Sequence, residues 1–264
     1  MINKDQVLKK VDSIEDKLLI SKVIDKALKA EREYTVTYTN FLDPRQKALI
    51  KKHLIGELDV KSEFNGGYSG AEREVAIFAP EFLSLDDESF YSDILKAVSV
   101  KTAGDSGLTH RDFLGSLMGL GIKREKIGDI IVNEDTCKIV VLNEIAEYIA
   151  LNLDKVGKVK VKAEITDISN VSTPNAKFKE INTTVASLRL DAITSAGFGI
   201  SRTKALDYIK GEKVSINWET VSSPAKEVKE GDIISFKGKG RAVLEKIGSE
   251  TKKGRITVTL KKYI

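Results

Sequence analysis

Two basic residues stand at the start of a helical pattern near the C-terminus of the chain. Ser201 is a typical helix N-cap, and Arg202 and Lys204 follow it in the first turn. The helix macrodipole disfavours each cation there by roughly 0.3–1 kcal/mol. A bound phosphate removes this conflict, because the free N–H groups and both side chains then face an anion. Arg189 on the preceding expected helix extends the group; the alternative is that these long side chains only cover apolar neighbours.

The distribution of charge bears on this choice. Residues 181–264 contain 16 Lys and Arg against 9 Asp and Glu, whereas the rest of the chain contains 27 against 30. The positive excess therefore lies entirely in the last third of the chain. Such an excess is typical of a region that binds a polyanion, although an ordinary solvated basic surface gives the same count.

Metal, redox and nucleotide chemistry have little basis in the sequence. Cys137 is the only cysteine, so an intrachain disulfide is impossible, and His53 and His110 lie far apart. No Gly-rich loop precedes a Lys-Ser or Lys-Thr pair, and the glycines at 197 and 199 do not follow an expected strand. We expect no metal, no cofactor and no catalytic residue.

The elements that position these residues belong to an expected α+β multidomain fold. Residues 1–80 are typical of an α/β domain, with an amphipathic helix over 3–32, a helix that starts at Pro44 and strands near 34–39, 58–64 and 74–78. Residues 81–168 follow the order β-α-β-β-α-β, with one helix that Thr109 opens and a second that Asn143 caps. This order is that of a ferredoxin-like sandwich and of the RNA-recognition motif (RRM).

The expected strands of this RRM-like middle domain lack the exposed aromatic residues on which such motifs stack bases. Ile130, Ile131, Val140 and Val141 are expected in the core instead. Residues 169–182 are expected to be a linker. Residues 183–264 are expected to form a last domain with a helix over 184–196 that Gly197 ends, a second helix from Ser201 to Gly211, and strands over 214–218 and 233–236.

No run of about eighteen apolar residues is present, so no membrane span is expected. The N-terminal residues lack the uninterrupted apolar core of a signal peptide. With its high share of charged residues, the composition is typical of a soluble cytosolic protein.

The last domain resembles the RNA-binding domain named after small-subunit ribosomal protein S4. The residues that carry the resemblance are Arg189-Leu190-Asp191, Gly197, Ser201-Arg202, Ala205, Ile209, Gly211, Val214, Ile216-Asn217, Gly231-Asp232 and Gly238–Arg241. The resemblance implies a helix pair, the alpha-L motif, on a small antiparallel sheet. It also implies that Arg189, Ser201, Arg202 and Lys204 contact the RNA backbone, with Lys237, Lys239 and Arg241 as weaker candidates on the sheet side.

The whole chain resembles the YlmH family of bacterial S4 proteins. The run LTHRDFLGSLMGLGIKREKIGDI, with FLDPRQ upstream and a glycine-rich turn between them, carries this resemblance. It implies a cytoplasmic, non-enzymatic protein that binds ribosomal RNA, or tRNA on the large ribosomal subunit. The implied role is ribosome rescue, assembly or translation control, with a link to cell-division gene clusters.

A second basic patch is expected in the middle domain. Thr109 and Asp112 have the spacing of a capping box, which places His110 in an exposed first turn and makes an acid–base role unnecessary. The patch faces RNA in one interpretation and is a solvated loop in the other. It consists of His110, Arg111, Lys123, Arg124 and Lys126.

Two other classes of function remain open at this point. Arg189-Leu190-Asp191 imitates the motif of a pseudouridine synthase, in which the aspartate is the nucleophile, but Leu188 replaces the usual glycine and the S4-like domain comes last instead of first. An enzyme of that type is the alternative to a binding protein. The N-terminal domain, in which acidic residues are more frequent than in the last domain, is also a candidate for binding a protein partner.

Overall fold

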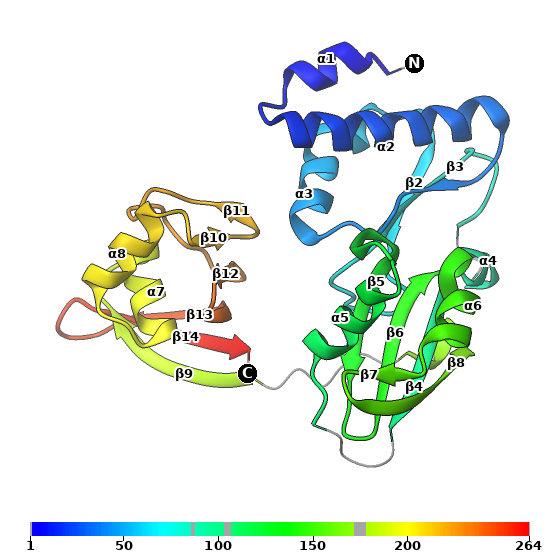
Figure 1. Cartoon of the computed structure of the whole chain (residues 1–264). Coiled ribbons are helices and arrows are strands. Elements are labelled where there is room, and N and C mark those ends of the chain that lie inside the picture. The colour runs from blue at the N-terminus through cyan, green and yellow to red at the C-terminus, as the bar shows by residue number, and fades with distance from the viewer. Residues whose placement is uncertain (1, 86–87, 103–106, 172–177, 264) are drawn as a thin grey trace. The chain divides into compact units, whose positions relative to one another are not determined.

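The computed structural model describes residues 2–85, 88–102, 107–171 and 178–263 (Figure 1). The chain forms two compact units, residues 1–174 and residues 175–264. We describe each unit by itself and call them the N-terminal and the C-terminal unit.

The N-terminal unit contains two sheets with helices on them. Its helices are α1 (Lys4–Lys9), α2 (Ile14–Glu33), α3 (Pro44–His53), α4 (Glu88–Ile94), α5 (His110–Gly119) and α6 (Asn143–Asn152), with short 3-10 turns η1 (Ile55–Glu57), η2 (Arg124–Lys126) and η3 (Ile168–Asn170). Its strands are β1 (Thr37–Tyr38), β2 (Lys61–Asn65), β3 (Val75–Ala79), β4 (Leu95–Thr102), β5 (Ile127–Val132), β6 (Thr136–Leu142), β7 (Lys155–Val156) and β8 (Val159–Thr166).

The first helical pattern of the chain forms two helices instead of the single one that its apolar spacing predicts. Helix α1 stops at Lys9, and Ser13 takes the extended conformation of an N-cap before α2 starts. Helix α2 then buries Ile20, Val23 and Ile24 against the first sheet, whose strand order is β1-β3-β2. The predicted start of α3 is confirmed, because Asp43 and Gln46 form a capping box and Pro44 occupies the first turn.

The second sheet has the strand order β5-β6-β4-β8-β7, and all its pairings are antiparallel. Along the chain its elements follow the predicted order, β4-α5-β5-β6-α6-β8. Thr109 and Asp112 form the expected capping box at the start of α5. The expected cap at Asn143 is wrong: Leu142 is the N-cap of α6, and the Asn143 amide donates to the carbonyl oxygen of Asp93 instead.

The second sheet is buried on both faces over β5, β6 and the start of β4, whereas no residue of β8 is buried. One face, with Val98, Ile139 and Val141, forms a core with α5 and α6. The opposite face, with Ala97 and Val140, packs against Phe41, Val75 and Ile77 from the first sheet region. The expectation that Ile130, Ile131, Val140 and Val141 lie in the core is confirmed. The first 80 residues therefore cover part of the face that an RRM leaves open for bases, while the paired residues Lys101 and Lys162 further along that face are exposed.

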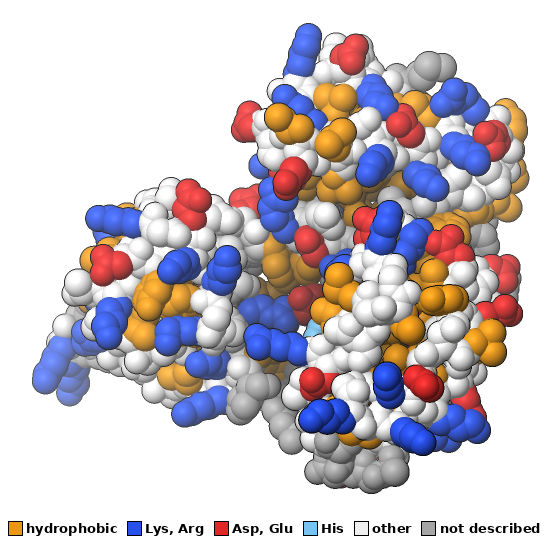
Figure 2. Space-filling view, in the orientation of Figure 1, with side chains coloured by type: hydrophobic (Ala, Val, Ile, Leu, Met, Phe, Trp, Pro, Cys, Tyr) orange, Lys and Arg blue, Asp and Glu red, His pale blue; other side chains and the backbone are white. Residues whose placement is uncertain are grey.

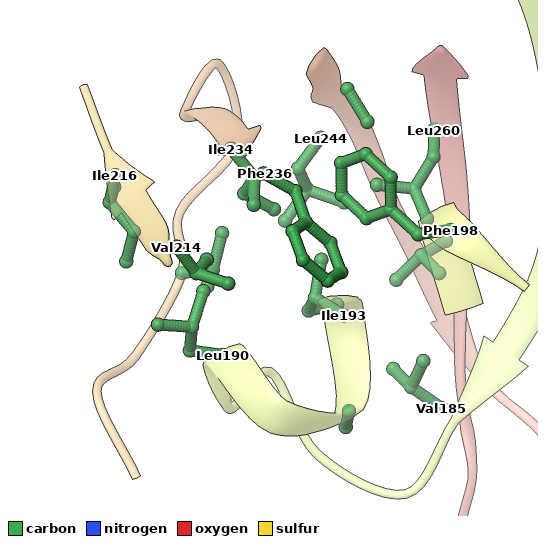
Figure 3. Packing of buried hydrophobic residues seen from close by; sticks show 14 of the residues in the cluster. Val185, Leu190, Ile193, Phe198, Val214, Ile216, Ile234, Phe236, Leu244 and Leu260 are labelled. Atoms are coloured by element: carbon green, nitrogen blue, oxygen red, sulfur yellow. The ribbon is translucent and has the colours of Figure 1, made fainter. Parts of the chain in front are cut away.

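The C-terminal unit has one six-stranded antiparallel sheet and two short helices. Its helices are α7 (Leu190–Phe198) and α8 (Arg202–Lys210), and its strands are β9 (Phe178–Val185), β10 (Val214–Ile216), β11 (Glu219–Thr220), β12 (Ile233–Phe236), β13 (Gly240–Glu250) and β14 (Ile256–Tyr263). The strand order is β11-β10-β12-β13-β14-β9. Figure 3 shows Ile193 and Phe198 of α7 packed on Phe236, Leu244 and Leu260 of the sheet.

The first helix of this unit starts later than predicted. Thr184 and Val185, expected inside the helix, end strand β9 and pair with β14, because β-branched residues favour the sheet. Arg189 is the N-cap of α7. Gly197 does not end the helix: it lies inside α7 against Leu260 and Ala242, and Gly199 is the left-handed C-cap, with φ of 63°.

The expected linker 169–182 also differs from the structure. Residues 168–170 form η3 and residues 178–182 belong to the edge strand β9, while residues 172–177 lie outside the described residues. Strands β9, β13 and β14 were not predicted. Charged and polar residues interrupt the alternation in β9 and β13, whereas Ile256–Leu260 of β14 does alternate apolar residues with threonine and the pattern was missed. Expected strand 214–218 ends at Ile216, since Asn217 and Trp218 form a turn with positive φ.

In the described part of the chain, no helix is long and apolar enough to cross a membrane.

Candidate nucleic-acid interface

A buried carboxylate joins the two helices of the C-terminal unit. The side chain of Asp191, 2% exposed, binds Arg189 Nε through Oδ1 at 3.2 Å and Arg202 Nε through Oδ2 at 3.0 Å. Arg189 Nη2 adds a contact of 3.3 Å to Oδ2. The two arginines themselves are 43% and 47% exposed. We call Arg189, Asp191 and Arg202 the arginine–aspartate cluster.

The backbone around the cluster pairs with the loop that follows β11 in the chain. Arg189 forms an isolated β-bridge with Glu227, and the amide of Leu190 donates to the carbonyl oxygen of Lys226 at 2.8 Å. The start of α8 is fixed separately, because Ser201 Oγ accepts from the Lys204 amide at 3.3 Å. The prediction that Ser201 caps this helix is confirmed.

Two opposing effects act on Asp191. Burial alone raises the pKa of its carboxyl, but the hydrogen bonds from Arg189 and Arg202 outweigh burial, and the net pKa lies below its ordinary value. Asp191 is therefore ionised at neutral pH. These contacts give Asp191 a role in charge pairing between the two helices.

This cluster changes the argument about cations at a helix start. Arg202 has an internal anionic partner, so Asp191 offsets part of the conflict with the macrodipole of α8. The contact uses Nε of Arg202, which leaves the Nη groups of its planar fork outside the contact. Together with exposed Lys204 and the half-exposed Arg189, the arrangement presents positive charge at the starts of two helices. Groups of this kind bind phosphate well.

Of the sheet-side candidates, Lys237 and Lys239 lie in the turn between β12 and β13, and Arg241 lies at the start of β13. Lys239 Nζ lies 5.9 Å from the centre of the Phe236 ring, and Arg241 Cζ lies 5.2 Å from the centre of the Tyr263 ring. Lys237 is exposed, and its amide donates to the carbonyl oxygen of Lys213. Figure 2 shows many Lys and Arg side chains on the visible face of this unit.

The residues of the second expected patch lie on two elements. His110 and Arg111 start α5, Lys123 is the N-cap of η2, and Arg124 and Lys126 lie within η2. Lys123, Arg124 and Lys126 line a groove of about 1050 Å³ beside α2. Lys22, Lys26 and Lys29 of α2 line the same groove.

Arg124 is turned toward its own chain. It donates through Nη1 to the carbonyl oxygens of Ile127 at 2.5 Å and of Gly128 at 3.2 Å. Burial and then the neighbouring charge of Arg73 lower the pKa of Arg124 to about 10. Partial burial and the charge of Arg124 also lower the pKa of His110. Lys126 forms an ion pair with Glu144 at 2.5 Å, so Arg124 and Lys126 both have internal partners.

The glycine-rich turn joins the two sheets of the N-terminal unit. Asp129 of β5 accepts hydrogen bonds from the Tyr68 hydroxyl and the Glu72 amide, both at 2.7 Å, and from the Arg73 amide at 3.1 Å. Arg73 then donates to the carbonyl oxygens of Ile127 and Phe41, each at 3.1 Å. This junction was not predicted; its residues stabilise the unit and leave little for a ligand.

Metal chemistry has no support in the structure. Cys137 is buried, and burial raises the pKa of its thiol to about 12. Among the described residues, no group of three or more His, Cys, Asp or Glu side chains is placed to hold a metal ion.

Sequence reasoning missed a pair of aromatic residues on the C-terminal sheet. The rings of Phe178 and Tyr263 lie 4.8 Å apart, and Phe178 is 43% exposed. The strands that carry them were not predicted, so their pairing could not be anticipated. In the sequence, each of these aromatic residues stands beside lysine, and this was a signal that could have drawn attention to them.

Three family models match this chain. One described as "YlmH, N-terminal" matches residues 15–82, one described as "Putative RNA-binding domain in YlmH" matches residues 103–170, and the S4 domain matches residues 188–234. The match at residues 103–170 thus includes the whole second sheet except β4, and the S4 match begins just before α7 and ends in β12.

Similar proteins agree with these matches. The ribosome-associated protein quality control protein P2 of Bacillus subtilis is 37% identical over 244 residues, which cover 90% of this chain and 93% of that protein. The small ribosomal subunit protein uS4 of Desulfotalea psychrophila is 44% identical over 55 residues, 20% of this chain and 26% of that protein.

A solved structure supports the fold. The cell division protein ylmH from Streptococcus pneumoniae superposes with a TM-score of 0.53 and 21% identity, over 61% of this chain and 98% of that chain. Because the identity extends over nearly the full length of the Bacillus subtilis relative, and both YlmH models match in order before an S4 domain, this chain belongs to the YlmH family.

Proposed function

We propose that this chain binds structured RNA through the arginine–aspartate cluster and Lys204. The observation that carries the proposal is the burial of Asp191 between two half-exposed arginines. A buried carboxylate that orients two guanidinium groups reduces the entropy they lose on binding a phosphate. Lys237, Lys239 and Arg241 on the sheet side extend the basic surface, and Ser201 fixes the start of α8 by its cap.

The RNA that we propose is ribosomal. The Bacillus subtilis relative is named as a ribosome-associated quality control protein, and the S4 region is similar to a ribosomal protein. We therefore infer that the chain associates with the ribosome in the cytoplasm and acts in translation quality control. Ribosomal RNA or tRNA on the large subunit is the expected partner.

We assign the N-terminal unit a supporting part in this function. Its second sheet has the strand order of a ferredoxin-like, RRM-like domain, over residues 81–168. Residues 1–80 cover the part of its open face formed by β5, β6 and the start of β4, so we expect no RNA contact through stacked bases there. Lys123 at the start of η2 and the lysines of α2 are the residues we propose for a weaker RNA contact, and Arg111 with His110 for a contact at α5. A protein partner of the first 80 residues is compatible with this arrangement.

We propose a binding protein and not an enzyme. In the rival hypothesis, Asp191 attacks a uridine as in a pseudouridine synthase. Its side chain is 2% exposed and accepts hydrogen bonds from two arginines and from the Ala192 amide. A nucleophile must reach its substrate, and Asp191 is both enclosed and neutralised by cations. Modified uridine that appears in RNA only with active protein would favour the enzyme.

The proposal is tested by co-sedimentation of the full chain with purified ribosomal subunits. Arg202→Gln with Lys204→Gln removes two charges at the start of α8. Glutamine is preferable to glutamate at position 202, because a glutamate would lie beside the ionised Asp191. We expect a loss of affinity for large subunits of about tenfold or more, since a charged hydrogen bond contributes roughly 1.5–3 kcal/mol.

The matched control changes the same number of charges elsewhere in the unit. Lys252 and Lys253 are exposed between β13 and β14. Lys252→Gln with Lys253→Gln is expected to change the affinity less than threefold. If the two double variants lost the same affinity, binding would depend on nonspecific charge and not on this interface. Unchanged sedimentation of the Arg202 and Lys204 variant would overturn the proposal.

A further inference from the structure

Three side chains form a row across three neighbouring strands of the C-terminal sheet. Tyr263 of β14 pairs directly with Phe178 of β9, and the pairing of Ala242 with Lys262 places Arg241 of β13 opposite Tyr263 on its other side. The two rings lie 4.8 Å apart at 60°, and Arg241 Cζ lies 5.2 Å from the centre of the Tyr263 ring. We call Arg241, Tyr263 and Phe178 the aromatic row.

The aromatic row lies on the face of the sheet that is turned away from α7. Successive residues of a strand alternate between faces. Leu260 of β14 is buried in the core with α7, and Lys262 lies over Phe198 of that helix, so Tyr263 and Lys261 belong to the opposite face. Phe178 is 43% exposed and Tyr263 is half-buried. The core of the unit therefore does not explain why two aromatic rings stand together here.

The charged side chains at this end of the sheet divide between its two faces. Lys179 and Lys262 alternate to the opposite face, where Lys262 lies over Phe198. On the face of the aromatic row, Lys261 pairs with Glu245 at 2.8 Å, and Glu180 accepts from Asn182 Nδ2 at 2.7 Å. Arg241 is therefore the cation adjacent to the rings, and exposed Lys237 and Lys239 stand in the turn just before it.

A shallow groove of about 300 Å³ lies further along the sheet, beyond the pair formed by Lys261 and Glu180. By register its polar side chains point to the same face as Tyr263, because Thr259 pairs with Asn182 and with Lys246, and Thr257 pairs with Thr184. Hydroxyl and amide groups of this kind can bind the 2′-hydroxyls and phosphates of RNA without a preference for sequence.

We propose that the aromatic row stacks an unpaired base of RNA and that the groove receives the adjoining nucleotides. Aromatic rings beside arginine and lysine are the usual platform for single-stranded nucleic acid. A protein partner fits less well, since the groove beyond the row is lined by threonine, asparagine and lysine and offers little apolar area to bury. The proposal rests on the proposed function. It implies that the C-terminal unit binds an RNA duplex that is flanked by an unpaired segment.

The experiment compares two RNA hairpins in binding to the full chain. One hairpin ends in a blunt stem, and the other has the same stem with four unpaired nucleotides that include 2-aminopurine, whose fluorescence is quenched on stacking. We expect the wild type to bind the extended hairpin at least fivefold more tightly and to quench the probe. Phe178→Leu and Tyr263→Leu should lose this gain and the quenching while they bind the blunt hairpin normally.

Two control variants separate this proposal from the proposed function. Phe82 is 69% exposed in the N-terminal unit, and Phe82→Leu is expected to behave as the wild type with both hairpins. Arg202→Gln with Lys204→Gln should weaken binding to both hairpins by the same factor. Equal wild-type affinity for the two hairpins, or full quenching by Tyr263→Leu, would overturn the stacking site and leave the proposed function intact. Failure of the wild type to bind either hairpin would overturn both.

Discussion

Both units of this chain contain a β-sheet with helices on it, but the two sheets differ in how their faces are covered. In the second sheet of the N-terminal unit, β5, β6 and the start of β4 are buried on both faces, by α5 and α6 on one side and by Phe41, Val75 and Ile77 on the other. The sheet of the C-terminal unit has α7 on one face, while the other face carries polar side chains and the aromatic row. A β-sheet can therefore be a scaffold or a binding surface, and the layer that covers it decides between them.

The arginines repeat the contrast. In the N-terminal unit, Arg73 and Arg124 donate to backbone carbonyl oxygens, and burial lowers the pKa of both. In the C-terminal unit, Arg189 and Arg202 are half-exposed around an ionised carboxylate. The first pair supports the fold, whereas the second pair keeps part of each guanidinium available for an anion.

The largest expected effect on stability comes from replacing one phenylalanine of each unit by alanine. Phe41→Ala should lower the free energy of unfolding by about 3–5 kcal/mol, because this fully buried ring fills the space between the two sheets of the N-terminal unit. Phe178→Ala should lower it by less than about 1 kcal/mol, since the ring is 43% exposed. Urea denaturation followed by circular dichroism measures both. A large loss at Phe178 would make the aromatic row a structural element.

A smaller effect is expected from the carboxylate of the cluster. Asp191→Asn should lower the free energy of unfolding at pH 7 by about 2 kcal/mol through loss of charged hydrogen bonds. Because the folded pKa of Asp191 is depressed, its stabilisation is present above the unfolded pKa and disappears as the pH falls through the folded pKa. The stabilities of wild type and variant should thus converge in strong acid. A difference that does not change with pH would show that the charge of Asp191 contributes nothing.

The smallest expected changes in stability come from replacing one glycine by alanine in each unit, Gly197 in α7 and Gly128 in β5. An added methyl group at Gly197 would lie 3.5 Å from Leu260, and alanine favours a helix, so Gly197→Ala should raise the stability by about 0.5–1 kcal/mol. At Gly128 the methyl group would lie 2.7 Å from the Phe41 ring, so Gly128→Ala should be destabilising by about 1 kcal/mol or more. Thermal melts of the two variants give the comparison. A loss of stability at Gly197 would indicate that the helix needs glycine there after all.

Local patterns were sufficient where one short segment decides the structure. The capping boxes at Asp43 and Thr109, the cap at Ser201 and the start of β12 at Ile233 all follow from neighbouring residues. The family was also recognisable, because its motifs lie in continuous runs. Spacing failed at Thr184, Gly197 and Asn143, where a strand partner, a packed helix or a distant carbonyl outweighs the local preference.

By itself, the sequence determined the charge asymmetry, the order of the elements in the middle domain and the basic residues at the start of α8. Only the tertiary structure decided what each basic residue contacts. Arg202 and Arg124 were both expected in basic patches, yet one meets a buried carboxylate from another helix and the other meets carbonyls of its own loop. The same holds for Phe178 and Tyr263, which lie 85 positions apart and become one surface through strand pairing. Such contacts depend on long-range packing, which no local pattern contains.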